Sequence, residues 1–135
     1  LNLKNKDTFS DRLIILLFHF GFFLQFFKDE ATKKDAQNLF DFVIKQIELS
    51  IREIGYGDVS INKKMKDYVN LFYLILEKIE KWHSLEKSKK TNLIADLINI
   101  DRDNDLLANY FDKYREFLIN NPLKNFRKDI IEFKF

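Results

Sequence analysis

The stretch LIILLFHFGFFLQFF, Leu13 to Phe27, is apolar apart from His19, Gly21 and Gln25. Its apolar side chains would cover every face of a helix instead of one stripe, and a helix of that kind is buried in the middle of a larger structure. We therefore expect Leu13 to Phe27 to form a central helix around which the rest of the chain packs.

A membrane-inserted helix and a signal peptide are the alternatives for this stretch. A transmembrane helix needs about 20 predominantly apolar residues, and shorter runs are more often core helices or the apolar part of a signal peptide. A secretory signal would continue into a small-residue cleavage site, whereas Lys28, Asp29 and Glu30 follow here. The pattern favours a buried helix over both alternatives. Because the chain opens with Leu1, we also expect that an upstream N-terminal segment can precede it.

The composition predicts one all-α domain over residues 1–135. With 46% hydrophobic residues, the chain is large enough for a core, and Gly 3 and Pro 1 are too few for the many turns of a β-sandwich or barrel. Because the cysteine count is 0, there is no disulfide framework, thiolate zinc site or cysteine nucleophile. A net charge of +2 does not supply a broad phosphate-binding surface, so we expect no sequence-specific nucleic-acid partner.

Apolar residues recur at three- and four-residue steps in several further segments, which predicts a bundle of about five helices. Lys87 to Lys90 is interpreted as a polar connection, and Phe126 to Phe135 as either a short strand or a terminus fixed to the core. The second predicted helix runs from about Lys33 to Ile54, and the third is capped by Asp58 or Ser60 and runs to about Trp82, with His83 in its core stripe. A short helix is predicted for Thr91 to Ile100. The last predicted helix ends before Pro122, and its apolar stripe comprises Leu107, Tyr110, Phe111, Tyr114, Phe117 and Leu118.

The sequence contains few candidates for a catalytic or metal site. Asp101, Asp103 and Asp105 imitate the start of a calcium loop, but Leu106 replaces the glycine and Asp112 the bidentate glutamate that such a loop needs. We interpret the acids as the start of a helix, where they suit the positive end of the dipole.

The two histidines are interpreted as structural. Glu80 and His83 have the spacing of a di-iron ligand pair, but such bundles need a second pair and two more glutamates, so the pair is interpreted as a helix end. His19 has apolar neighbours and is interpreted as a core histidine with one ring nitrogen bonded to backbone or a carboxylate. We expect no enzyme activity, no catalytic or metal-binding residue and no cofactor.

The segment IREIGYGDVSINKKMK, Ile51 to Lys66, places lysines near a helix start, where the helix dipole disfavours them. Gly55 ends one helix in the left-handed conformation, and Gly57 permits a second sharp turn. The lysines that follow oppose the dipole of the next helix, an interaction of about 0.3 to 1 kcal/mol. They form either a basic patch for an acidic partner or anionic lipid, or a solvated face that nearby acids neutralise. The lysines are Lys63, Lys64 and Lys66, and the acids are Glu53, Asp58 and Asp67.

The same segment carries a resemblance. The run Arg52 to Ser60, followed by Lys63-Lys64-Met65-Lys66 and Phe72-Tyr73, resembles the ubiquinol-cytochrome c chaperone family, and His19, Phe40-Asp41 and Glu48 also sit where that family has similar residues. The similarity extends from about Leu13 to Lys78. The sequence differs from the family pattern at Leu74-Ile75, where relatives commonly have Gly-Arg. It also differs at Gln25 and Phe26, where relatives have basic residues.

The resemblance implies an all-α assembly factor for the cytochrome bc1 complex that assists newly made cytochrome b and is not an enzyme. It implies cytochrome b or another bc1 subunit as partner, and a small partner chaperone. The lysine patch adds the expectation of a peripheral contact with an anionic membrane. The location would be the bacterial cytoplasm at the inner membrane, or mitochondria in a eukaryote. The implied binding surface comprises Arg52, Glu53, Gly55, Gly57, Asp58, Lys63, Lys64, Lys66, Phe72 and Tyr73.

Two further expectations concern the surface of the domain and its role. Relatives carry a segment before the Leu-rich helix, and only a few polar residues precede it here, so we expect an exposed apolar groove beside that helix. The alternative function is a helical membrane-surface or protein-interaction adaptor without chaperone activity.

Overall fold

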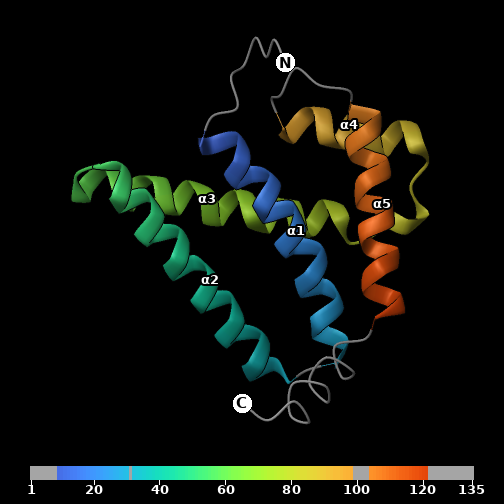
Figure 1. Cartoon of the computed structure of the whole chain (residues 1–135), viewed down its shortest axis with the longest axis horizontal. Helices are drawn as coiled ribbons and strands as arrows, with labels where there is room; N and C mark the ends of the chain where they lie inside the picture. The colour runs from blue at the N-terminus through green and yellow to red at the C-terminus, as the bar shows by residue number, and fades with distance from the viewer. Residues whose placement is uncertain (1–8, 31, 99–103, 122–135) are drawn as a thin grey trace.

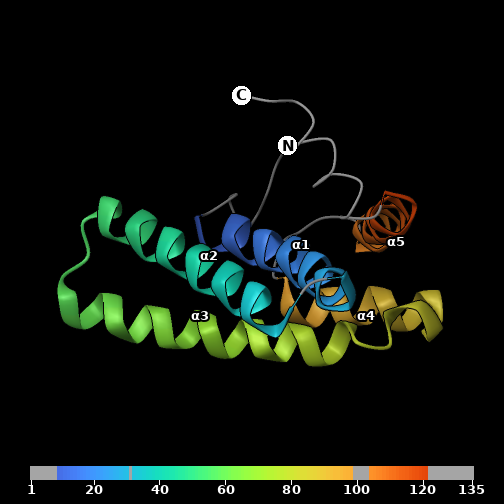
Figure 2. The same ribbon diagram turned by 90° about the horizontal axis from the view of Figure 1, so that it is seen from below.

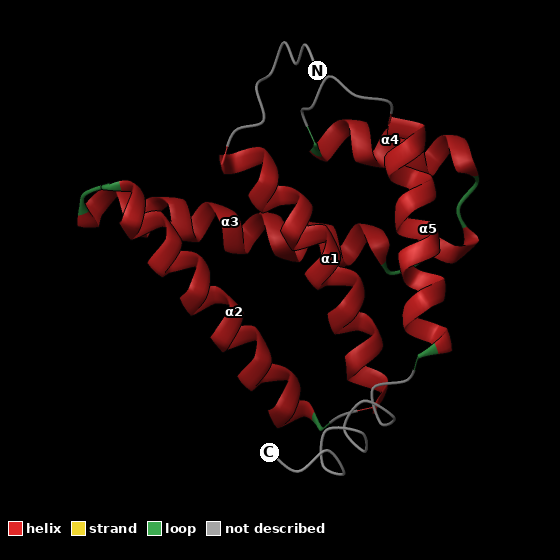
Figure 3. Cartoon of the chain, viewed as in Figure 1, coloured by secondary structure: helices red, strands yellow, loops and turns green. Residues whose placement is uncertain are grey.

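The all-α prediction is confirmed. The computed structural model describes residues 9–30, 32–98 and 104–121, and in these ranges it contains helices and loops and no strand (Figure 3). The elements are α1 (Phe9–Glu30), α2 (Lys33–Ile54), α3 (Asp58–Ile79), the 3-10 turn η1 (Trp82–Ser84), α4 (Lys87–Leu97) and α5 (Asn104–Asn120).

Helix α1 lies at the centre, as its all-round apolar sequence predicts. α2 lies on one side of it and α5 on the other (Figure 1), and α1 and α2 lie over α3 (Figure 2). α4 packs on α5. The buried side chains of α1 meet aromatic and branched residues of the other helices: Leu13, Leu17, Phe18, Phe20, Phe22 and Leu24 come from α1, and Ile47, Phe72, Ile75, Ile79, Trp82 and Phe111 from its partners.

α1 passes a length and composition test for a membrane span over Phe9–Phe27. The central helix of a water-soluble protein passes the same test, because both need a long apolar run. Here Leu17 and Phe18 are completely buried against other helices of the chain. The structure buries 39% of this stretch within the bundle, so the buried interpretation holds for part of its surface.

Gly21 brings α1 and α3 close together. A Cβ atom at this position would lie 3.0 Å from the Cδ1 of Ile79 and 3.4 Å from the Cγ2 of Ile75. The absent side chain thus makes room for two isoleucines of α3. This contact accounts for a glycine in the middle of an otherwise bulky helix.

The expected end of the third helix was wrong. α3 ends at Ile79, and the chain turns through η1 so that Trp82 is buried while His83 is exposed instead of lying in the core stripe. The Trp82 Nε1 donates to the Asp112 Oδ1 at 2.7 Å, and the Lys90 Nζ contacts the same oxygen at 2.7 Å. A contact with α5 therefore sets the turn, and local periodicity did not reveal it.

The polar connection expected at Lys87 to Lys90 was also wrong, since these residues form the first turn of α4. Lysine is a good helix former, and Lys90 is drawn inward by Asp112 and by the Trp82 ring, whose centroid is 5.3 Å from the Lys90 Nζ. α4 ends at Leu97. Ile100, the calcium-like Asp101 and Asp103, Pro122 and the ambiguous 126–135 segment lie outside the described residues.

In α5, the expected stripe was partly wrong. Phe111 and Leu118 are buried, but Tyr110 and Phe117 are exposed. Neighbouring residues on a helix differ in direction by about 100°. Tyr110 and Phe117 therefore point away from the face of α5 that α1 and α4 cover, although they are adjacent in sequence to the buried Phe111 and Leu118.

His19 joins α1 to α5, and its predicted backbone hydrogen bond is confirmed. Its Nδ1 lies 2.8 Å from the Ile15 carbonyl oxygen, and its Nε2 lies 2.5 Å from the Tyr110 hydroxyl. Because a carbonyl only accepts, the Nδ1 carries the hydrogen, and in the neutral ring the Nε2 accepts from Tyr110. The histidine is half-buried, and both ring nitrogens are engaged in structural contacts.

Candidate functional site

The corner between α2 and α3 is built by its two glycines in different ways. Gly55 follows Ile54 with a φ of 102°, and its N–H donates to the Arg52 carbonyl at 3.0 Å, which ends α2 as predicted. Gly57 has a φ of −73° and is the N-cap of α3, without a side-chain cap. The expected cap at Asp58 or Ser60 was therefore wrong, because both residues already lie inside α3.

We expect the same substitution to have opposite effects at these two positions. Gly55→Ser should destabilise by about 1–2 kcal/mol, since an L-residue resists the left-handed region. Gly57→Ser should stabilise by a few tenths of a kcal/mol, because its φ suits any residue and serine supplies the missing cap oxygen. Chemical unfolding of both variants checks this, and an equal loss at both sites would contradict the assignment.

An ion-pair network connects the two arms of the corner. The Arg52 guanidinium contacts the Asp58 carboxylate at 2.8 Å and the Glu48 carboxylate at 3.2 Å, while Lys45 contacts Glu48 at 3.0 Å. Hydrogen bonds from Lys45 and Arg52 lower the pKa of Glu48, and those to Asp58 and Glu48 raise the pKa of Arg52. These pairs are solvent-exposed and orient the corner more than they stabilise it.

Among the residues that the structure describes, the corner lysines form no ion pair with the nearby acids. Asp58 is engaged by Arg52, and within the described ranges neither Glu53 nor Asp67 forms an ion pair with Lys63 or Lys66. Those two lysines are exposed. Lys64 instead places its Nζ 4.5 Å from the centroid of the Tyr56 ring, a cation–π contact.

The structure separates Phe72 and Tyr73 from the rest of the proposed surface. Phe72 is completely buried and stacks on Phe20, with ring centroids 5.1 Å apart, so it supports the core and does not face a partner. Tyr73 is exposed and stacks on Phe40 at 5.9 Å. It lies about 22 Å along α3 from Asp58, too far to share one small site with the corner.

An exposed apolar groove lies between α1 and α2. Its volume is about 490 Å³. Leu13 and Ile47 are its most buried lining residues, while Leu16 keeps 49% of its surface exposed. The remaining lining residues are Phe9, Arg12, Val43, Gln46 and Ser50. The sequence suggested a groove beside the central helix but not these residues, because the lining is shared by two helices whose divergence only the structure shows.

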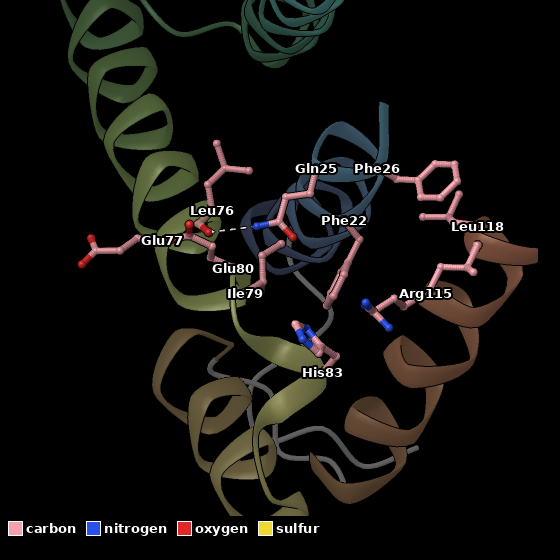
Figure 4. A pocket seen from close by; sticks show the side chains of 11 residues that line it. Phe22, Gln25, Phe26, Leu76, Glu77, Ile79, Glu80, His83, Arg115 and Leu118 are labelled. Atoms are coloured by element: carbon pink, nitrogen blue, oxygen red, sulfur yellow. Dashed lines mark hydrogen bonds between the residues drawn. The ribbon is translucent and has the colours of Figure 1, made fainter. Parts of the chain in front are cut away.

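A second cleft of about 500 Å³ lies where α1, α3, η1 and α5 meet. In Figure 4, the side chains of His83 and Arg115 extend toward this cleft from below Phe22 and Gln25. The Gln25 Nε2 donates to the Leu76 carbonyl at 3.2 Å. Glu80 and His83 do not share one helical face, since α3 ends at Ile79. Among the residues that the structure describes, no group of three histidine or acidic side chains is arranged to hold a metal ion.

The geometry defines a helical protein with an open apolar groove and a projecting charged corner, features suited to binding another macromolecule. A family model described as Ubiquinol-cytochrome C chaperone matches residues 1–133. The chain belongs to this family. No curated protein and no solved structure shows significant similarity to it.

Proposed function

We propose that the protein is an assembly chaperone for the cytochrome bc1 complex that binds newly made cytochrome b, and acts by binding instead of catalysis. The observation that carries this is the open apolar groove between α1 and α2 in a member of the ubiquinol-cytochrome c chaperone family. We place the protein in the bacterial cytoplasm at the inner membrane, or in mitochondria of a eukaryote, with a small partner chaperone as a further contact.

The groove suits an apolar helix of a membrane subunit. Burial of apolar surface contributes about 25 cal/mol per Å² and is non-directional, so Leu16 and Val43 can hold an apolar segment without reading its sequence. Such binding is reversible, because few hydrogen bonds must be broken on release. A membrane subunit awaiting cofactors or partner subunits needs a cover of this kind.

We expect Leu16→Asp to abolish chaperone function without unfolding the protein. A charge in the groove opposes the docking of an apolar helix, whereas Leu16 is half-exposed and tolerates a polar group. A strain of the natural host lacking the gene is complemented with wild type, Leu16→Asp, or the control Leu106→Asp, whose leucine is 66% exposed on α5. The measurement is the amount of assembled bc1 complex.

Wild type and Leu106→Asp should restore the complex, and Leu16→Asp should not. Unchanged bc1 levels in the deletion strain would overturn the proposal. Normal complementation by Leu16→Asp would remove the groove from it and favour an adaptor that works through another surface.

A further inference from the structure

The corner forms an apolar apex that no other part of the described chain covers. The α2–α3 hairpin projects beyond the bundle (Figures 1 and 2), and three apolar side chains at its end are exposed: Ile54 at 49%, Tyr56 at 43% and Val59 at 85%. A Cβ atom at Gly55 or Gly57 would meet nothing within 4 Å. The apex is therefore open and convex.

Basic side chains follow this apex along α3, one helical turn apart. Lys63 and Lys66 follow Val59 by four and seven residues, which places all three on one face of α3. With a rise of about 1.5 Å per residue, the lysines start about 6 and 10 Å behind Val59. Lys64 adds a cation next to Tyr56, since its Nζ lies 4.5 Å from that ring.

A convex apolar tip followed by cations suits an anionic bilayer, in which an apolar layer lies beneath charged headgroups. Proteins that lie at this interface bury apolar side chains about 5–10 Å into the boundary between headgroups and acyl chains, with tyrosine at headgroup level and lysines near the charged headgroups. A protein partner would instead need a cavity to receive the tip. Glu53, Asp58 and Asp67 lower the local positive charge, so apolar insertion should contribute alongside the electrostatic attraction.

We propose that the apex formed by Ile54, Tyr56 and Val59 docks the protein onto anionic phospholipid membranes, with Lys63 and Lys66 contacting lipid phosphates. This goes beyond client binding, because the groove is lined by other residues of α1 and α2. Docking would hold the groove next to the membrane into which a client subunit is inserted.

The test is flotation of the full chain with vesicles of phosphatidylcholine, alone or mixed with phosphatidylglycerol at about 7:3. Each basic group near an anionic surface strengthens binding about fivefold, so Lys63→Gln/Lys66→Gln should reduce binding to mixed vesicles by up to about 25-fold and change binding to neutral vesicles little. Val59→Asp should reduce binding to mixed vesicles by about tenfold. Leu106→Asp is the matched control, since it introduces the same charge at another exposed apolar residue, which is 66% exposed and lies on α5.

Wild type and Leu106→Asp should float with mixed vesicles. Failure of wild type to float, or equal losses for Val59→Asp and Leu106→Asp, would overturn the proposal. If Val59→Asp failed to restore bc1 assembly but still bound vesicles, the proposal would also be overturned, because the tip would then contact a protein. Leu16→Asp should float normally. The vesicle assay therefore tests membrane binding independently of client binding.

Discussion

We expect Leu17→Asp to abolish the cooperative thermal transition of the protein. Leu17 is completely buried in the central helix, and a carboxylate there has no partner to compensate the loss of water. Even after relaxation, an unpaired buried ion costs several kcal/mol, comparable with the total stability of about 5–15 kcal/mol typical of a domain. Circular dichroism and the fluorescence of Trp82, the only tryptophan of the chain, report the transition.

The adjacent residue provides the control. Leu16→Asp introduces the same side chain into the same helix, with the same loss of helix propensity of less than about 0.7 kcal/mol, but at a position that is 49% exposed. It should melt cooperatively within a few degrees of wild type. A cooperative melt of Leu17→Asp at the wild-type temperature would mean that α1 is not the core of the folded protein.

Most of the helical framework was predictable because it depends on local chemistry. α2 has the predicted bounds, Lys33 and Ile54. Gly55 ends it, and the Thr32 hydroxyl caps its start by accepting from the Asp35 N–H at 3.1 Å. The central position of α1 followed from apolar residues on every face. The turn at Trp82 was not predictable, since it depends on Asp112, which lies 30 residues further along the chain.

The candidate site was predictable only where one residue type demands one conformation. Gly55 is such a case, because its φ of 102° favours glycine. Phe72 and Tyr73 are adjacent and similar, yet one is buried and the other exposed. Which face of α3 is covered depends on where α1 and α2 lie. The groove depends on the same arrangement, so its lining residues appear only in the folded structure.

We expect Trp82→Ala to be the most damaging truncation in the C-terminal half of the protein. The Trp82 ring packs edge-on against Phe22 with centroids 5.3 Å apart and connects η1 to α5 through Asp112. Removal of a buried tryptophan costs about 3–5 kcal/mol, through lost contacts and the cavity that remains. Urea unfolding followed by circular dichroism measures the loss without needing the tryptophan signal.

Trp82→Phe separates packing from hydrogen bonding. Phenylalanine keeps an aromatic ring near Phe22 but cannot donate to Asp112, whose Oδ1 is still contacted by the Lys90 Nζ at 2.7 Å. Because Lys90 continues to satisfy the carboxylate, Trp82→Phe should lose well under half of what Trp82→Ala loses. Equal losses in the two variants would show that the indole N–H, and not the volume of the ring, fixes α5 to the turn after α3.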